Sequence, residues 1–112
     1  MQLALIAMLW ALPAAAAPVD HGRLLAATCA ACHGTNGNSA VGTPVLAGLD
    51  PGYFSAQMHA FQRNERASTV MHHLSKDFTD AEIEQMAAFF AKQPRTSPQA
   101  PAAAPLPISP AH

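Results

Sequence analysis

Residues 29–33 read Cys-Ala-Ala-Cys-His, and this stretch decides how the rest of the chain is interpreted. On one helical turn, two thiols three residues apart and the imidazole that follows them project from the same side. The thiols can then form thioethers with the two vinyl groups on one edge of a porphyrin, while the imidazole binds the iron. The C-x-x-C-H motif therefore predicts one covalently bound haem c, with Cys29 and Cys32 as thioether positions and His33 as an axial iron ligand. The other ring nitrogen of His33 should donate to a backbone carbonyl.

Other uses of the two cysteines explain the motif less well. A structural zinc site needs about four ligands, often in two pairs, and the chain has 2 cysteines in all. A thioredoxin-like pair is expected near a βαβ pattern, which the sequence does not show. A structural disulfide in an oxidising compartment would satisfy both cysteines but would leave His33 without a role.

The N-terminal residues have the pattern of an export signal. Residues 3–12 are an unbroken apolar run, which Pro13 and four alanines follow. An apolar run before small residues is typical of a secretory signal peptide, and this one is shorter than the about 20 residues of a membrane span. We expect a signal peptide over residues 1–16, cleaved after Ala16 or Ala17, and a bacterial periplasmic location. The Lys or Arg that usually precedes the apolar run of a signal peptide is missing here. The alternative to a cleaved signal peptide is a buried N-terminal helix or a retained membrane anchor.

Residues 94–112 have the composition of a disordered tail. This segment is rich in Pro and Ala and has few large apolar residues, so it cannot bury enough surface to offset the entropy of ordering. Residues 17–93 remain as one small domain, whose core is marginal unless a buried porphyrin adds apolar bulk. The formal net charge of -1 gives no basic surface for nucleic acid, and we expect no membrane span in the mature chain.

Helical signals dominate the domain, and no alternation of period two appears, so the sequence predicts an all-α fold. Asp20 is the expected N-cap of a helix over residues 21–27, Asp50-Pro51 opens a second helix, and Thr79 with Glu82 forms a capping box for a third that ends before Pro94. Residues 34–48 and 64–77 are expected as loops. The apolar stripes of the second and third helices contain Phe54, Met58, Phe61, Ile83, Met86, Ala87 and Phe90.

The second axial ligand of the iron has three candidates, which are Met71, His72 and His73. Met71 lies in an expected loop and off any apolar stripe, so its thioether is free to reach the face opposite His33. Met58 and Met86 fall on helical stripes and are predicted to pack in the core. A bis-histidine site would lower the reduction potential relative to a His/Met site.

Five segments of the chain, in this order, match the pattern of a known family: GRLLAATCAACHG at 22–34, TPVLAGL at 43–49, GYFSAQMHAFQ at 52–62, STVMHHL at 68–74 and FTDAEIEQMAAFFAKQ at 78–93. In this order the chain resembles the small class I cytochromes c, and among them the cytochrome subunit of flavocytochrome c sulfide dehydrogenases. The resemblance implies the class I cytochrome c fold, with about three to four helices packed around one covalently bound haem.

The resemblance also implies roles for individual residues. Met71 corresponds to the distal iron ligand. Pro44 resembles the loop proline whose carbonyl holds the proximal imidazole, and Leu46 resembles a haem-packing residue. Gly22 resembles the glycine of the N-terminal helix that lets an aromatic residue of the C-terminal helix, here Phe89 or Phe90, pack closely.

These assignments imply one-electron transfer, because an iron with two axial protein ligands has no open position for a substrate. No acid-base or nucleophile constellation is seen, so no catalytic residues are assigned. The expected partners are redox proteins. The chain is either the cytochrome subunit of a sulfide-oxidising flavoprotein or a freely diffusing carrier that donates to a terminal oxidase or reductase. A haem enzyme or ligand sensor with a labile Met71 is a further alternative.

Overall fold

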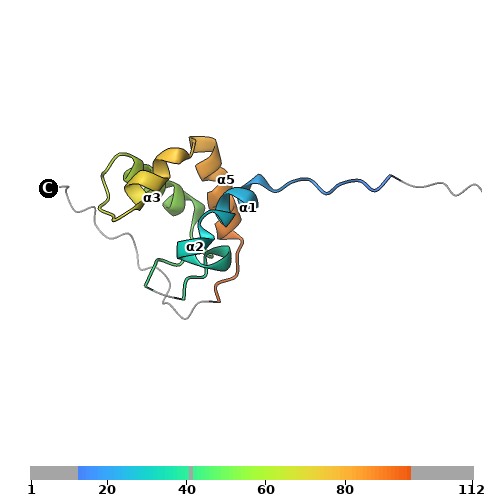
Figure 1. The fold of residues 1–112 in the computed structure, drawn as a ribbon, viewed down its shortest axis with the longest axis horizontal. Helices are drawn as coiled ribbons and strands as arrows, with labels where there is room; N and C mark the ends of the chain where they lie inside the picture. Colours follow the sequence, from blue (N-terminus) through green and yellow to red (C-terminus); the bar gives the residue numbers. More distant parts are fainter. Residues whose placement is uncertain (1–12, 41, 97–112) are drawn as a thin grey trace, which may run out of the picture.

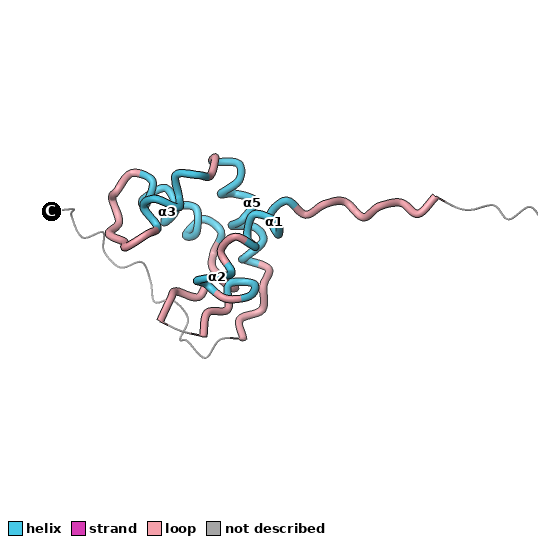
Figure 2. Tube along the Cα trace, viewed as in Figure 1, coloured by secondary structure: helices cyan, strands magenta, loops and turns pink. Residues whose placement is uncertain are grey.

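The computed structural model describes residues 13–40 and 42–96. Within these residues every regular element is helical (Figures 1 and 2), which confirms the predicted all-α class. Three longer helices form the frame, and one-turn helices and 3-10 segments connect them. In chain order the elements are α1 (His21–Ala27), α2 (Ala30–His33), η1 (Thr35–Gly37), α3 (Pro51–Gln62), α4 (Met71–Leu74), η2 (Ser75–Asp77) and α5 (Asp80–Ala91).

The three longer helices begin at the capping residues that the sequence predicted. The Asp20 carboxylate accepts a hydrogen bond from the backbone N–H of Arg23 at 3.1 Å, and Asp50 accepts one from Tyr53 at 2.8 Å. At the start of α5, Thr79 and Glu82 exchange side-chain and backbone hydrogen bonds in a complete capping box. Each cap satisfies N–H groups that have no partner inside the helix, so local sequence alone sets these helix starts.

The core lies where α1 and α3 pack against α5. Phe54 and Phe90 meet with their ring centroids 5.5 Å apart, and Ile83 and Met86 are fully buried. Met58 is 6% exposed. The expectation that Met58 and Met86 pack in the core is therefore confirmed, and neither side chain is free to act elsewhere.

The expected loop over residues 64–77 contains two short helical elements, so the prediction that Met71 lies in a loop was wrong. Met71 is the first residue of α4, and the hydroxyl of Ser68 accepts the backbone N–H of His72 at 2.9 Å. The carbonyl of Val70 accepts from His73 and Leu74 at 3.0 and 3.1 Å. A helix of one turn is too short to show a periodic apolar pattern, so the sequence did not reveal α4. With α2 and α4, the described residues contain five α-helices.

Gly22 is the point of closest approach between α1 and α5. A Cβ atom at this position would lie 2.5 Å from the carbonyl oxygen of Gln85 and 3.2 Å from its carbonyl carbon. The predicted close approach is confirmed: the nearest atoms belong to the backbone of Gln85, and Phe89, one turn later on α5, lines the pocket at this crossing together with Gly22. Phe90 instead points into the core, where it is 1% exposed, because it lies on a different face of α5 from Gln85.

The ends of the described chain differ from each other. Residues 13–19 are exposed and have no regular structure. Beyond α5, the side chain of Asn38 donates to the carbonyl of Pro94 at 3.0 Å and accepts from the N–H of Thr96 at 2.7 Å. Most of the expected signal peptide and of the expected tail lies outside the described residues. No helix among those described has the length and apolar character needed to cross a membrane.

We predict that Gly22→Ala lowers the free energy of unfolding by about 1–2 kcal/mol. Alanine improves helix propensity by about 1 kcal/mol, but overpacking against a backbone carbonyl costs about 1–3 kcal/mol, and the α1–α5 crossing must open to relieve it. The measurement is urea unfolding of the purified protein. Gly42→Ala is the control, since a Cβ there meets nothing within 4 Å. A Gly22→Ala protein as stable as this control would contradict the role given to the crossing.

Candidate functional site

The C-x-x-C-H segment forms the one-turn helix α2 directly after α1. Cys29 is its N-cap, and the N–H of His33 donates to the carbonyl of Cys29 at 2.9 Å. Gly34 ends the turn with a φ of 75°, which glycine adopts without strain. The two cysteines do not form a disulfide with each other. The helical turn expected from the spacing is therefore present, and it carries both thiols and the imidazole.

The two thiols have different surroundings. Cys29 is half-buried and packs against the core, whereas Cys32 is exposed. Burial raises the pKa of the Cys29 thiol above its ordinary value, although the Thr28 hydroxyl, 3.9 Å from Sγ, acts in the opposite direction.

The imidazole of His33 is held by one hydrogen bond to a distant loop. Its Nδ1 lies 2.7 Å from the backbone oxygen of Pro44. A carbonyl can only accept, so Nδ1 carries the proton and Nε2 keeps its lone pair for a metal. The hydrogen bond expected from the sequence is thus present, and it sets the tautomer that binding of iron requires.

The loop that supplies Pro44 is anchored to α5. Gly37 has a φ of 77°, and its carbonyl accepts from the N–H groups of Leu46 and Ala47 at 2.8 and 3.2 Å. The N–H of Gly48 donates to the carbonyl of Phe90 at 2.8 Å. Leu46 packs against the core cluster as a partly buried residue. The loop therefore holds Pro44 and Leu46 in fixed positions relative to the C-terminal helix.

The three candidates for the distal ligand differ in what surrounds them. Met71 is partly buried and packs against the core cluster. His72 is held by Ser68, whose Oγ lies 3.0 Å from its Nδ1. The ring of His73 lies tilted against that of His72, with the centroids 4.0 Å apart, and His73 is exposed. The structure thus brings Met71, Cys29 and Leu46 to the same core cluster.

Sequence reasoning missed Gln62, the last residue of α3. Its Nε2 donates to the carbonyls of Ser75 and Phe78 at 2.8 and 3.0 Å, in the segment that follows Met71. Its Oε1 lies 2.9 Å from Nδ1 of His59. A lone glutamine at a helix end has no signal in the sequence, because its partners are 13 and 16 residues away.

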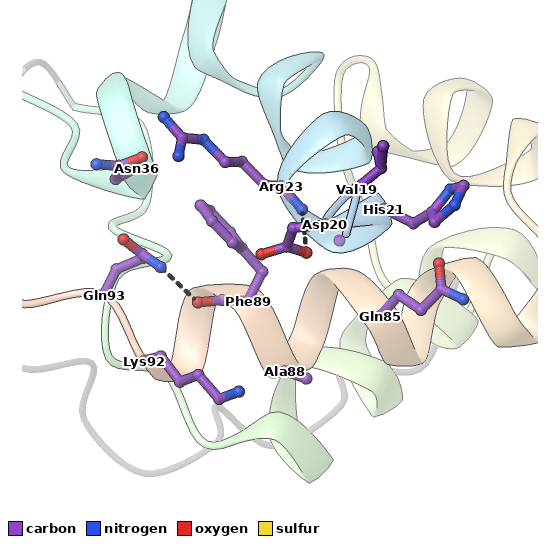
Figure 3. A pocket seen from close by; sticks show the side chains of 11 residues that line it. Val19, Asp20, His21, Arg23, Asn36, Gln85, Ala88, Phe89, Lys92 and Gln93 are labelled. Atoms are coloured by element: carbon purple, nitrogen blue, oxygen red, sulfur yellow. Dashed lines mark hydrogen bonds between the residues drawn. The ribbon is translucent and has the colours of Figure 1, made fainter. Parts of the chain in front are cut away.

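A pocket of about 580 Å³ opens at the α1–α5 crossing, on a different part of the surface. Figure 3 shows Asp20 and Arg23 on the α1 side and Phe89 and Lys92 on α5. Neither cysteine lines it, nor do His33 and Met71. The pocket is a feature of the helix crossing and not of the C-x-x-C-H site. In the described part of the chain, no three His, Cys, Asp or Glu side chains cluster to hold a metal ion by themselves.

Comparison with known families gives a match over residues 16–90 to the family described as cytochrome C oxidase, cbb3-type, subunit III. This range includes the C-x-x-C-H turn, the Pro44 loop and Met71. The chain is also similar to a solved structure, the as-isolated thiosulfate dehydrogenase (TsdBA) of Marichromatium purpuratum, with a TM-score of 0.65 and 30% identity. The similarity covers 76% of this chain and 21% of that one.

Three curated proteins are among the chain's relatives. The cytochrome subunit of sulfide dehydrogenase of Chlorobaculum tepidum is 38% identical over 71 residues, which is 63% of this chain and 64% of that protein. The thiosulfate dehydrogenase electron acceptor of Thiomonas intermedia is 37% identical, over 85% of this chain and 43% of its own length. Cytochrome c4 of Pseudomonas aeruginosa is 39% identical, over 70% and 40%. The chain therefore spans less than two thirds of the length of each of these relatives.

Proposed function

The chain belongs to the family of cytochrome c domains described as cbb3-type cytochrome c oxidase, subunit III, and we propose that it carries single electrons between redox proteins. Relatives in sulfide and thiosulfate dehydrogenases are cytochrome subunits or electron acceptors by name, and the family carries covalently bound haem c. The bound haem supplies an iron that alternates between the ferric and ferrous states. The observation that carries the proposal is the His33–Pro44 hydrogen bond of 2.7 Å, made by an imidazole that shares one helical turn with two cysteines that form no disulfide.

The residues present fit this haem. Cys29 and Cys32 are the proposed thioether positions, and the Nε2 of His33 is the proposed proximal ligand. The carbonyl of Pro44 fixes the imidazole, and Leu46 contributes apolar surface where a porphyrin would pack. A carbonyl partner on Nδ1 also raises the basicity of the ligating nitrogen, which strengthens the ferric state.

Met71 is the proposed distal ligand. Its side chain is partly buried against the core cluster, whereas His72 is held by Ser68 and His73 faces solvent. A thioether in this position raises the reduction potential relative to a second imidazole. With His33 and Met71 both on the iron, no position stays open for a substrate. The alternative, a haem enzyme or ligand sensor, requires Met71 to leave the iron readily.

We predict that Met71→Ala abolishes the weak thioether-to-iron band in the near infrared, lowers the potential and allows carbon monoxide to bind the ferrous protein. Met58→Leu is the control, because Met58 is a buried core residue and the swap conserves volume. It should change none of the three readouts. Loss of the band in Met58→Leu alone would contradict the assignment. A band that neither change affects would point to His72 or His73.

The surface beside Met71 is the proposed contact region for redox partners. Val70, the N-cap of α4, and Leu74, its last residue, are 50% and 47% exposed, and Cys32 is exposed on α2. Exposed apolar side chains beside a proposed haem edge allow close approach of a partner.

The proposed partner is a dehydrogenase that oxidises an inorganic sulfur compound, and its specific form is a sulfide-oxidising flavoprotein. The names of the relatives support this choice. The alternative is a free carrier that donates to a terminal oxidase or reductase. We also propose export to the bacterial periplasm, with a signal peptide over residues 1–16, a cytochrome c domain over 17–93 and a tail from residue 94. The family match over residues 16–90 supports the limits of the domain.

We predict that the protein co-purifies with a flavin-containing chain and that sulfide reduces its haem rapidly only when that chain is present. Val70→Lys with Leu74→Lys should slow this reduction, because two charges would have to lose water at the contact. The control is Val19→Lys, since Val19 is 63% exposed but lines the pocket at the α1–α5 crossing. Equally fast reduction of the isolated cytochrome by sulfide would favour a free carrier.

A further inference from the structure

Gln62 connects the end of α3 to the backbone that follows Met71. Both hydrogens of its side-chain amide are used, one on the carbonyl of Ser75 at 2.8 Å and one on that of Phe78 at 3.0 Å. Ser75 is fully buried, and its hydroxyl has no hydrogen-bond partner. The segment from Ser75 to Phe78 is therefore held to α3 at both of its ends by a single side chain.

The orientation of Gln62 follows from these two bonds. An amide nitrogen that donates twice turns its oxygen to the opposite side, and Oε1 of Gln62 faces Nδ1 of His59 at 2.9 Å. An amide oxygen can only accept, so Nδ1 of His59 carries a proton. His59 lies one turn earlier on the same helix, and its Nδ1 is also 3.8 Å from Oδ1 of Asp80 at the start of α5. Gln62, oriented by His59, thus holds the chain between Met71 and α5.

This arrangement has a consequence for α4. Met71 opens that helix, and Ser75 follows its last residue directly. One turn of helix is not stable without tertiary support. At the start of α4, the hydroxyl of Ser68 accepts the N–H of His72. The backbone that follows α4 is fixed by Gln62. Removing the two donors of Gln62 would take the side-chain partner from the Phe78 carbonyl and would leave the Ser75 carbonyl with only the longer bond from the N–H of Phe78, at 3.4 Å. The segment could then move away from α3.

We propose that Gln62 is a positioning residue, oriented by His59, that keeps the thioether of Met71 on the haem iron. This inference rests on the proposed function, in which Met71 is the distal ligand. It assigns to Gln62 no contact with the haem. Its effect is on how readily Met71 leaves the iron, because it fixes the backbone immediately after the ligand-bearing turn.

The test is the binding of imidazole to the ferric holoprotein, in which the added ligand must displace Met71. The expected result for Gln62→Leu is an apparent affinity about tenfold higher than in the wild type, from the loss of two hydrogen bonds. Gln62→Glu keeps the shape but places a carboxylate against the two carbonyls, so the same direction is expected. The matched control is Gln57→Leu on the same helix, since Gln57 bonds Arg66 and no residue after Met71. It should stay within about twofold of the wild type.

A second readout separates positioning from general stability. In urea, the thioether-to-iron band of Gln62→Leu should disappear at a lower concentration than the helical circular dichroism, whereas the two should disappear together in Gln57→Leu. Unchanged imidazole affinity in Gln62→Leu, with the band present in the wild type, would overturn this proposal alone. Absence of the band from the wild type would overturn both this proposal and the assignment of Met71.

Discussion

The close packing of α1 on α5 at Gly22 is the contact on which the arrangement of the site depends. With the carbonyl of Gln85 only 2.5 Å from where a side chain would begin, glycine allows the two helix backbones to touch. Only two residues separate α1 from α2. The crossing of α1 and α5 therefore also sets where Cys29, Cys32 and His33 lie. On the other side, α5 anchors the loop that carries Pro44, through the hydrogen bond between Gly48 and Phe90. The imidazole and the carbonyl that orients it are thus both positioned relative to one helix.

The distal half of the site is built on a different helix. α3 buries Phe54 and Met58 in the shared core and ends at Gln62, which holds the backbone after Met71. The residues proposed as proximal and distal ligands therefore lie in segments that are short in themselves but are each tied to a longer helix. In a domain of this size a buried porphyrin contributes a large part of the apolar core. Attachment of haem is in this view part of folding as well as of function.

Much of this architecture could be predicted from local sequence. The three caps and the apolar stripes of α3 and α5 depend on residues a few positions apart, and the positions of the helices followed from them. The bond from His33 to Pro44 was anticipated from the chemistry of a metal-bound imidazole and from the resemblance to class I cytochromes c. Of the two aromatic residues expected beside Gly22, Phe89 lines the crossing and Phe90 is buried in the core, and the sequence did not reveal the direct contact with the backbone of Gln85 because it does not specify how two helices cross. The turn at Met71 and the bonds of Gln62 were missed because both depend on single polar side chains with no periodic pattern.

The central claim is that this chain is a c-type cytochrome that holds one haem covalently through Cys29 and Cys32, with the iron between His33 and Met71. The most direct test is the intact mass of the purified exported protein after extraction with acid and organic solvent, which removes haem that is not covalently bound. The account predicts that the wild-type protein has the mass of the polypeptide plus one haem. When both cysteines are changed to Ser, the protein should have the mass of the polypeptide alone. A wild-type protein that has the mass of the polypeptide alone, with the haem recovered in the solvent, would contradict it.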